Sequence, residues 1–295
     1  MDPPCWDYEA FADRVVSWAD DRHDVRLAVV FGSRAREDRP ADGWSDIDIA
    51  LVSTAAERYV HEDDWLGDLG TPLVTCTEDA PVGGFAERHV IFDGGLEVDF
   101  VAVPSDEVTP LGTAPDEVFD VLAHGYRVLV DKDDLAPALA SRVDDVATDE
   151  LGVALPGVDD FVETVHHCLY RAVWIAKKLR RGELWAAMHA LDGRLTQESL
   201  LPMIAWHARG VHGNHAWHAG RFIEEWADPR VIDELADTVA DYDPSECWRA
   251  LFATLDLFRW LSRETAAAAG YDYPSTAVEG VTALIDDLAP AGVRE

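Results

Sequence analysis

Two aspartates lie close together inside an apolar stretch of the chain. Residues 45–52 read Ser-Asp-Ile-Asp-Ile-Ala-Leu-Val, and the apolar residues around Asp46 and Asp48 predict a buried strand. Side chains alternate along a strand, so aspartates two positions apart lie on the same face. Unpaired charges would be very costly beside a core, so the pattern indicates a site for a divalent metal ion. The alternative is that the aspartates lie on an exposed strand of an acidic protein. The apolar residues Ile47 and Ile49 argue against this alternative.

A glycine and a serine end the apolar run that precedes the aspartates. Residues 29–34 read Val-Val-Phe-Gly-Ser-Arg, which predicts a strand that turns at Gly32 and Ser33 into a short helical segment. Backbone N–H groups at such a turn favour a phosphate. Thirteen residues separate Gly32 from Asp46, enough to carry the chain over the end of a sheet into a neighbouring strand. Taken alone, Gly32 and Ser33 also fit an ordinary strand-to-helix turn.

Together, the Gly-Ser turn and the apolar Asp-x-Asp strand resemble the nucleotidyltransferases of the DNA polymerase beta type. The chemistry of that superfamily implies a third carboxylate on a nearby strand. Residues 96–103 follow the turn signal Asp93-Gly94-Gly95, so they are expected to pair back as a hairpin. Asp99 interrupts this apolar strand and is the expected third carboxylate. Glu97 lies on the same face by alternation and is the rival candidate for the third carboxylate. The alternative role for Asp99 is a solvent contact at a strand end.

Hydrophobic periodicity predicts an α+β chain in which strands with helices are followed by a helical bundle. The resemblance implies that the first part is a polymerase-beta-like nucleotidyltransferase domain, a mixed sheet with helices. Loose composition between Asp144 and Val158 places the boundary between a domain at 1–148 and a domain at 149–295. The strands expected in the first domain are 26–31, 46–53, 73–77, 89–92, 96–103 and 126–131, with helical segments at 7–22, 63–70 and 134–140. The helices expected in the second are 161–181, 184–209, 221–226, 231–240, 247–269 and 277–288.

The charge balance is strongly acidic, with 24 basic residues, 57 acidic residues and a net charge of −33. A chain this negative repels nucleic acid and anionic membranes, so neither is expected as a partner, and basic small molecules are favoured. The chain has three lysines, Lys132, Lys177 and Lys178, and its acidic residues are spread along its whole length. This distribution is typical of a halophilic protein in a salty cytoplasm.

Neither cysteine spacing nor hydropathy indicates a disulfide framework, a zinc motif or a membrane span. The four cysteines lie far apart, and the N-terminal residues lack the features of a signal peptide, so a soluble cytoplasmic protein is expected. His212, His215 and His218 form a histidine-rich turn that could in principle hold a metal ion. With Gly213 inside it and no acidic residue or cysteine at ligand spacing, a polar loop between helices is the favoured interpretation.

Beyond the metal motif, the chain resembles the aminoglycoside 6-adenylyltransferases, the streptomycin-modifying branch of the nucleotidyltransferases. The resemblance follows the chain in order over nearly its whole length. It includes residues 26–27, 32–34, 40–48, 64–66 with Gly70, 93–94 with Asp99, 128–133, Lys177 with Leu179, 200–207 and 271–274.

This resemblance implies the transfer of AMP from ATP to a hydroxyl group of a streptomycin-like aminoglycoside, with release of pyrophosphate. Asp46 and Asp48 would bind one or two Mg²⁺ ions, and Asp99 would act as general base, as a metal ligand or as both. Monomer and homodimer are both compatible with the sequence. The identity of the acceptor stays open, because relatives are expected to have other residues at the positions of His167, Leu169 and Gln197.

The resemblance also implies a nucleotide site formed by Gly32, Ser33 and Arg34, with Lys177 reaching the phosphates from the bundle. An ordinary exposed helix position is the alternative for Lys177. The acceptor is expected between the domains, against carboxylates and aromatic residues, although core packing is the favoured role of each aromatic taken singly: Trp65, Tyr170, Trp174 and Trp206.

Two other functions are compatible with the same motif. One is a nucleotidyltransferase that acts on a lincosamide or on a metabolite hydroxyl. The other is an antitoxin-like module that binds a protein partner or adenylylates it, although such proteins are usually a minimal catalytic domain without a bundle of this size.

Overall fold

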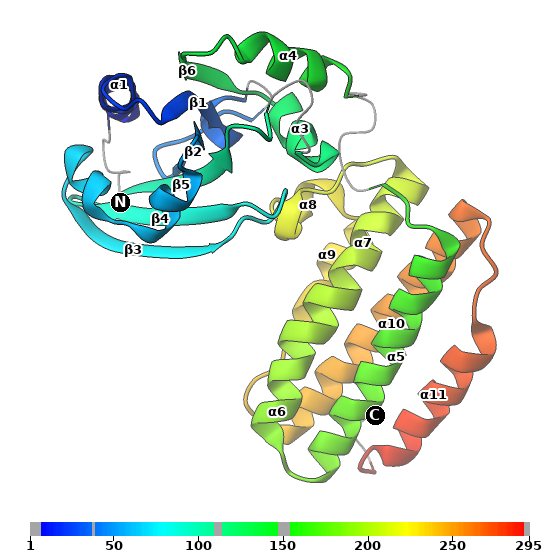
Figure 1. The fold of residues 1–295 in the computed structure, drawn as a ribbon. Helices are drawn as coiled ribbons and strands as arrows, with labels where there is room; N and C mark the ends of the chain where they lie inside the picture. Colours follow the sequence, from blue (N-terminus) through cyan, green and yellow to red (C-terminus); the bar gives the residue numbers. More distant parts are fainter. Residues whose placement is uncertain (1–6, 37–38, 109–113, 147–153, 292–295) are drawn as a thin grey trace. The chain divides into compact units, whose positions relative to one another are not determined.

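The computed structural model describes residues 7–36, 39–108, 114–146 and 154–291. The chain forms two compact units, Met1–Glu150 and Leu151–Glu295. The first contains a sheet with helices, and the described residues of the second form helices and loops (Figure 1). The predicted α+β class, with a mixed sheet followed by a helical bundle, is confirmed. The predicted boundary between residues 148 and 149 lies outside the described residues.

The sheet has six strands in the order β3-β4-β5-β2-β1-β6. β2 and β5 run parallel, and the other neighbouring pairs run antiparallel. The hairpin predicted at Asp93-Gly94-Gly95 joins β4 to β5, and both glycines have positive φ, as a tight hairpin turn requires. The strands are β1 Val25–Phe31, β2 Ile47–Ser53, β3 Pro72–Asp79, β4 Ala86–Phe92, β5 Leu96–Pro104 and β6 Arg127–Asp131.

Helices cover both faces of the sheet, each over its own apolar cluster. On one face lie α1 (Tyr8–Asp20), α2 (Ala56–His61) and the 3₁₀ helix η2 (Asp64–Asp68). On the other lie α3 (Asp116–Ala123) and α4 (Ala136–Asp144). These two layers bury the apolar side chains of the central strands from both sides, which holds β2 and β5 rigidly side by side.

The predicted helix at 134–140 begins two residues later than expected. Asp134 has a φ of 58°, which interrupts regular helical backbone. The side chain of Asp131 accepts hydrogen bonds from the backbone of Leu135 and Ala136, both at 2.9 Å, so it satisfies N–H groups at the start of α4. Hydrophobic periodicity does not reveal such an aspartate, which lies five residues before the first residue of the helix.

Trp65 belongs to the core of the first unit. Its side chain is fully buried, and its ring centroid lies 5.4 Å from that of Trp18, 5.2 Å from that of Tyr59 and 5.0 Å from that of Phe100. A ring enclosed in this way has no free face for an acceptor. Core packing, the favoured role of Trp65 taken singly, is therefore the observed one, and Trp65 does not serve as an acceptor contact.

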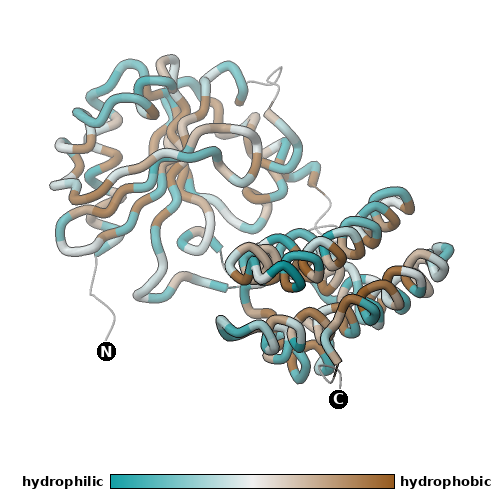
Figure 2. Tube along the Cα trace, turned by 90° about the horizontal axis from the view of Figure 1, so that it is seen from below, coloured by the Kyte–Doolittle hydropathy of each residue, from teal (hydrophilic) through white to brown (hydrophobic). Residues whose placement is uncertain are grey.

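Long helices form the second unit, and their apolar sides face one another in Figure 2. Leu184 to His212 is helical throughout, although the residues 190–200 and 208–212 are π-helical. Among the residues that the structure describes, no helix combines the length and the apolar character that crossing a membrane would need. The segments are α5 Val158–Arg180, α6 Leu184–His189, η4 Ala190–Leu200, α7 Leu201–His207, η5 Ala208–His212, α8 Ile223–Trp226, α9 Pro229–Leu235, α10 Pro244–Ala269 and α11 Ser275–Leu288.

Candidate active site

Three carboxylates meet where β2 and β5 begin. Asp48 on β2 lies directly opposite Asp99 on β5, and Asp46 comes immediately before the first residue of β2. One carboxylate oxygen from each of the three lies within 4.8 Å of the other two. Asp99 is buried, and the other two are partly buried. A set of converging carboxylate oxygens suits a hard divalent cation.

The alternation of β2 decides which way the carboxylates point. Ile47 and Ile49 are buried in the cluster beneath α1, so Asp48 between them is directed to the opposite face. On that face Ala50 follows it along the strand and packs against the cluster beneath α3 and α4. The apolar residues therefore fix the direction of the carboxylate, as the sequence predicts.

Asp99 has a histidine partner that the sequence analysis did not identify. His89 on β4 lies opposite Asp99 on β5, and its Nδ1 lies 2.7 Å from Asp99 Oδ1. Burial raises the pKa of Asp99, and the hydrogen bond and charge of His89 offset part of this effect. Counting residues outwards from the turn at Asp93-Gly94-Gly95 places His89 opposite Asp99. The predicted hairpin could therefore have identified His89 as the partner of Asp99.

The pKa of His89 is raised even though burial alone would lower it. Its hydrogen bond to Asp99 and the charges of Asp99, Glu87 and Glu78 favour the protonated ring and outweigh the burial. Nε2 of His89 lies 2.9 Å from Glu78 Oε1. The surrounding carboxylates of the sheet therefore favour the protonated form of His89.

More acidic groups surround the three aspartates. Burial and the charge of Asp99 raise the pKa of Glu87, and burial together with the charges of Asp46 and Asp99 raises the pKa of Glu97. Glu97, the rival to Asp99 in the sequence, is exposed. The excess of negative charge at this end of the sheet favours a bound cation.

Gly32 lies against the Asp48 carboxylate in a conformation suited to glycine. Its φ is 66°, and a Cβ at this position would overlap Asp48 Oδ2. Gly32–Arg34 forms a 3₁₀ turn directly after β1, as the Gly-Ser motif predicts. Ser33 Oγ is buried and has no hydrogen-bonding partner among the described residues, so it can serve a ligand there.

The side chain of Arg34 holds the loop that leads to Asp46. Its Nε donates to the carbonyl of Asp46 at 2.8 Å, and its Nη2 donates to the carbonyls of Ser45 at 2.6 Å and Asp42 at 3.2 Å. Its guanidinium also lies over the ring of Tyr8, 3.1 Å from the centroid. The structure thus shows Arg34 bound to backbone oxygens beside the carboxylates.

Lys177 lies in the second unit, exposed on α5. The other two lysines have protein partners: Lys132 donates to the carbonyls of Ala19 and Arg22 at the end of α1, and Lys178 pairs with Glu183. The structure thus brings Asp46, Asp48, Asp99, Gly32, Ser33 and Arg34 together within the first unit.

Comparison with known proteins identifies relatives along nearly the whole chain. A family profile described as streptomycin adenylyltransferase matches residues 7–288. The chain is similar to the aminoglycoside 6-adenylyltransferase of Bacillus subtilis (strain 168), with 23% identity over 273 residues that cover 90% of this chain and 91% of the relative. It is also similar to the aminoglycoside 6-adenylyltransferase of Staphylococcus aureus, with 22% identity over 272 residues that cover 88% of this chain and 91% of the relative.

A crystal structure of an aminoglycoside 6-adenyltransferase from Bacillus subtilis aligns with 94% of this chain and 97% of its own, at 21% identity and a TM-score of 0.45. The family profile spans nearly the whole chain, including the three aspartates, and it confirms the resemblance noted in the sequence. The chain is therefore a nucleotidyltransferase that belongs to the streptomycin adenylyltransferase family.

Proposed function

We propose that this chain transfers AMP from ATP to a hydroxyl group of a streptomycin-like aminoglycoside and releases pyrophosphate. The observation that carries the proposal is the convergence of Asp46, Asp48 and Asp99 beside the Gly32–Arg34 turn, in a chain whose relatives are named aminoglycoside 6-adenylyltransferases. A strongly negative chain also suits an acceptor that is a polycation.

The donor set fits magnesium. Asp46, Asp48 and Asp99 offer oxygen ligands alone, which Mg²⁺ prefers to nitrogen or sulfur ligands. When bound, Mg²⁺ would neutralise charge on the triphosphate as the α-phosphorus passes from one oxygen to another. The three aspartates would hold the ion, and the register that places Asp48 opposite Asp99 would fix two of these ligands.

Asp99 would accept the proton of the attacking hydroxyl. A carboxylate beside the reacting groups is a suitable acceptor for this proton. His89, 2.7 Å from Oδ1, would orient the carboxylate. We assign His89 a positioning role, because it would act through Asp99.

The nucleotide phosphates would bind at the turn after β1. The orphaned hydroxyl of Ser33 would donate to a phosphate oxygen, and Gly32 would let the backbone approach the Asp48 carboxylate. Arg34 would contribute by holding the loop from Asp42 to Asp46 in place. We propose Lys177 as a further ligand of the phosphates because of the family resemblance.

The direct test is a screen for pyrophosphate release with ATP and Mg²⁺ at high salt, across aminoglycosides and lincosamides. High salt suits the proposed halophilic surface. The proposal expects release with streptomycin and a mass gain of one AMP on the antibiotic. Turnover of a lincosamide alone would assign a different acceptor, and modification of a protein in place of the antibiotic would favour the antitoxin-like function.

A further inference from the structure

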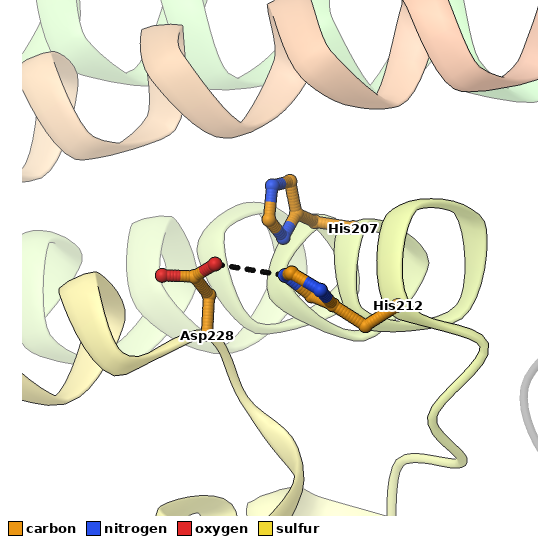
Figure 3. A group of neighbouring side chains, drawn as sticks. All are labelled: His207, His212 and Asp228. Carbon is orange, nitrogen blue, oxygen red and sulfur yellow. Dashed lines mark hydrogen bonds and ion pairs between the residues drawn. The ribbon is translucent and has the colours of Figure 1, made fainter.

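A second group of possible metal ligands lies within the helical unit. His207 ends α7, His212 ends η5, and Asp228 caps the start of α9. One ligand atom from each lies within 4.8 Å of the other two, and Figure 3 shows the three side chains directed at one another. This group consists of two imidazoles and one carboxylate, in contrast to the all-oxygen set of the sheet.

The second ring nitrogen of His207 has a carboxylate partner. The ring is fully buried, and its Nε2 lies 2.8 Å from Glu264 Oε2 on α10. The other oxygen of Glu264 accepts a hydrogen bond from Trp260 Nε1 at 2.8 Å. Because a carboxylate only accepts, this contact requires a proton on Nε2 of His207, and the neutral ring then has its lone pair on Nδ1.

That lone pair has no donor in the part of the chain that the structure describes. Nδ1 of His207 is buried and makes no hydrogen bond there, and Figure 3 shows it on the side of the ring that faces His212 and Asp228. An unsatisfied buried acceptor costs about 1–3 kcal/mol. A bound ion would remove this cost, and a histidine with its other nitrogen on a carboxylate is the usual form of a histidine metal ligand.

His212 and Asp228 complete the group. His212 Nε2 lies 2.8 Å from Asp228 Oδ2, while Asp228 Oδ1 accepts from the backbone N–H of Arg230 at 2.8 Å. Asp228 thus accepts a hydrogen bond at each of its two oxygens, and the exposure of His212 leaves an entry for an ion.

We propose that His207 Nδ1, His212 and Asp228 bind a zinc ion, or a metal ion of similar preference, with water in a fourth position. Imidazole nitrogen and carboxylate oxygen are ligands of Zn²⁺, and three protein ligands leave one position open. The ion would tie the end of the long helix to the start of α9, while Glu264 would fix the ring of His207. The site would stabilise the helical unit and is independent of the proposed transferase function.

The sequence interpretation of the histidine-rich turn missed this grouping. It considered His212 together with His215 and His218, but Nε2 of His215 lies 3.0 Å from Arg209 Nη1, and the side chain of His218 lies outside the described residues. The partners of His212 are five residues before it and sixteen residues after it, spacings that do not form a local motif.

The test is calorimetric titration of the full-length, metal-free chain with Zn²⁺. Excess Mg²⁺ is present throughout the titration, so that Mg²⁺ occupies the oxygen sites of the acidic surface. Wild-type chain is expected to bind one Zn²⁺ at this site. His212→Ala and Asp228→Asn are expected to weaken this binding by about a hundredfold or more. Asp228→Asn keeps an oxygen that can accept from Arg230, so the helix cap survives.

Two matched variants separate this site from its surroundings. His215→Ala removes a neighbouring histidine, and Asp46→Asn alters the carboxylates of the sheet, and both are expected to bind Zn²⁺ like the wild type. Co²⁺ in place of Zn²⁺ is expected to give the visible absorption of a four-coordinate ion in the His215→Ala chain but not in the His212→Ala chain. Absence of Zn²⁺ binding by the wild type in excess Mg²⁺, or equal affinity in His212→Ala, would overturn the proposal.

Discussion

Asp48 and Asp99 lie directly opposite each other on β2 and β5, the parallel pair of the sheet. Residues opposite each other on adjacent parallel strands point to the same face, so the register alone brings the two carboxylates together. A shift of one residue would turn one carboxylate to the other face. The candidate site therefore depends on the strand pairing as much as on the identity of the aspartates.

Asp48→Asn is expected to lower the rate of pyrophosphate release by about a thousandfold, because it removes a charged ligand of the metal ion. The melting temperature without metal is expected to stay the same or to rise, because the substitution relieves repulsion among three carboxylates. Asp20→Asn is the matched control, since Asp20 is exposed at the end of α1 on the opposite face of the sheet, and this variant is expected to keep most of the activity. Near-native turnover in Asp48→Asn would remove Asp48 from the metal site.

Gly32→Ala is expected to destabilise the fold by about 1–3 kcal/mol, because alanine is strained at a φ of 66° and its Cβ overlaps Asp48 Oδ2. The KM for ATP is expected to rise, since the turn would move away from the phosphates. Urea unfolding and steady-state kinetics measure the two effects. Gly67→Ala is the control, because nothing lies within 4 Å of a Cβ at that position. Equal stability of the two variants would contradict the close approach.

His89→Gln is expected to reduce stability most at low pH in metal-free buffer. The pKa of His89 is raised above its unfolded value near 6.5, so its stabilising contribution is fully present below pH 6.5 and is lost as the pH rises through the folded pKa. The measurement is the difference in unfolding free energy between wild type and variant, at one pH below 6.5 and at about pH 9. A difference that is the same at both pH values would show that His89 is not held as a cation.

Arg34→Lys is expected to lower the free energy of unfolding by about 1–2 kcal/mol, because a lysine amine cannot reproduce the fork that reaches three carbonyl oxygens. The activity is expected to fall as well, since the loop that carries Asp46 loses its support. Arg26→Lys is a matched control, because Arg26 lies on β1 and pairs with Asp133. Equal loss of activity in both variants would remove the specific role of Arg34.

Most of the sheet could be predicted from the sequence. The buried strands carry apolar, β-branched runs, and the turn at Asp93-Gly94-Gly95 requires glycine, so their physical causes are local. The turn at Gly32 and the convergence of Asp46, Asp48 and Asp99 follow from alternation together with the family resemblance. The helices of the second unit were predicted because their apolar sides repeat over many turns.

The elements and contacts that were missed have causes outside the local pattern. The short helices α2 and α3 have too few turns for a clear period. Core packing was favoured for Trp65, but an acceptor contact stayed open because the burial of a tryptophan depends on the neighbours that tertiary packing supplies. The contacts of His207 with Glu264 and of His212 with Asp228 join residues far apart in the chain, so spacing could not reveal them.

A crystal structure with Mn²⁺ and a non-hydrolysable ATP analogue tests the central claim most directly, because anomalous scattering locates the ion. Mn²⁺ is expected among the carboxylates of Asp46, Asp48 and Asp99, with the triphosphate against Gly32 and Ser33. An anomalous peak elsewhere, with these three carboxylates free of metal and nucleotide, would contradict the account.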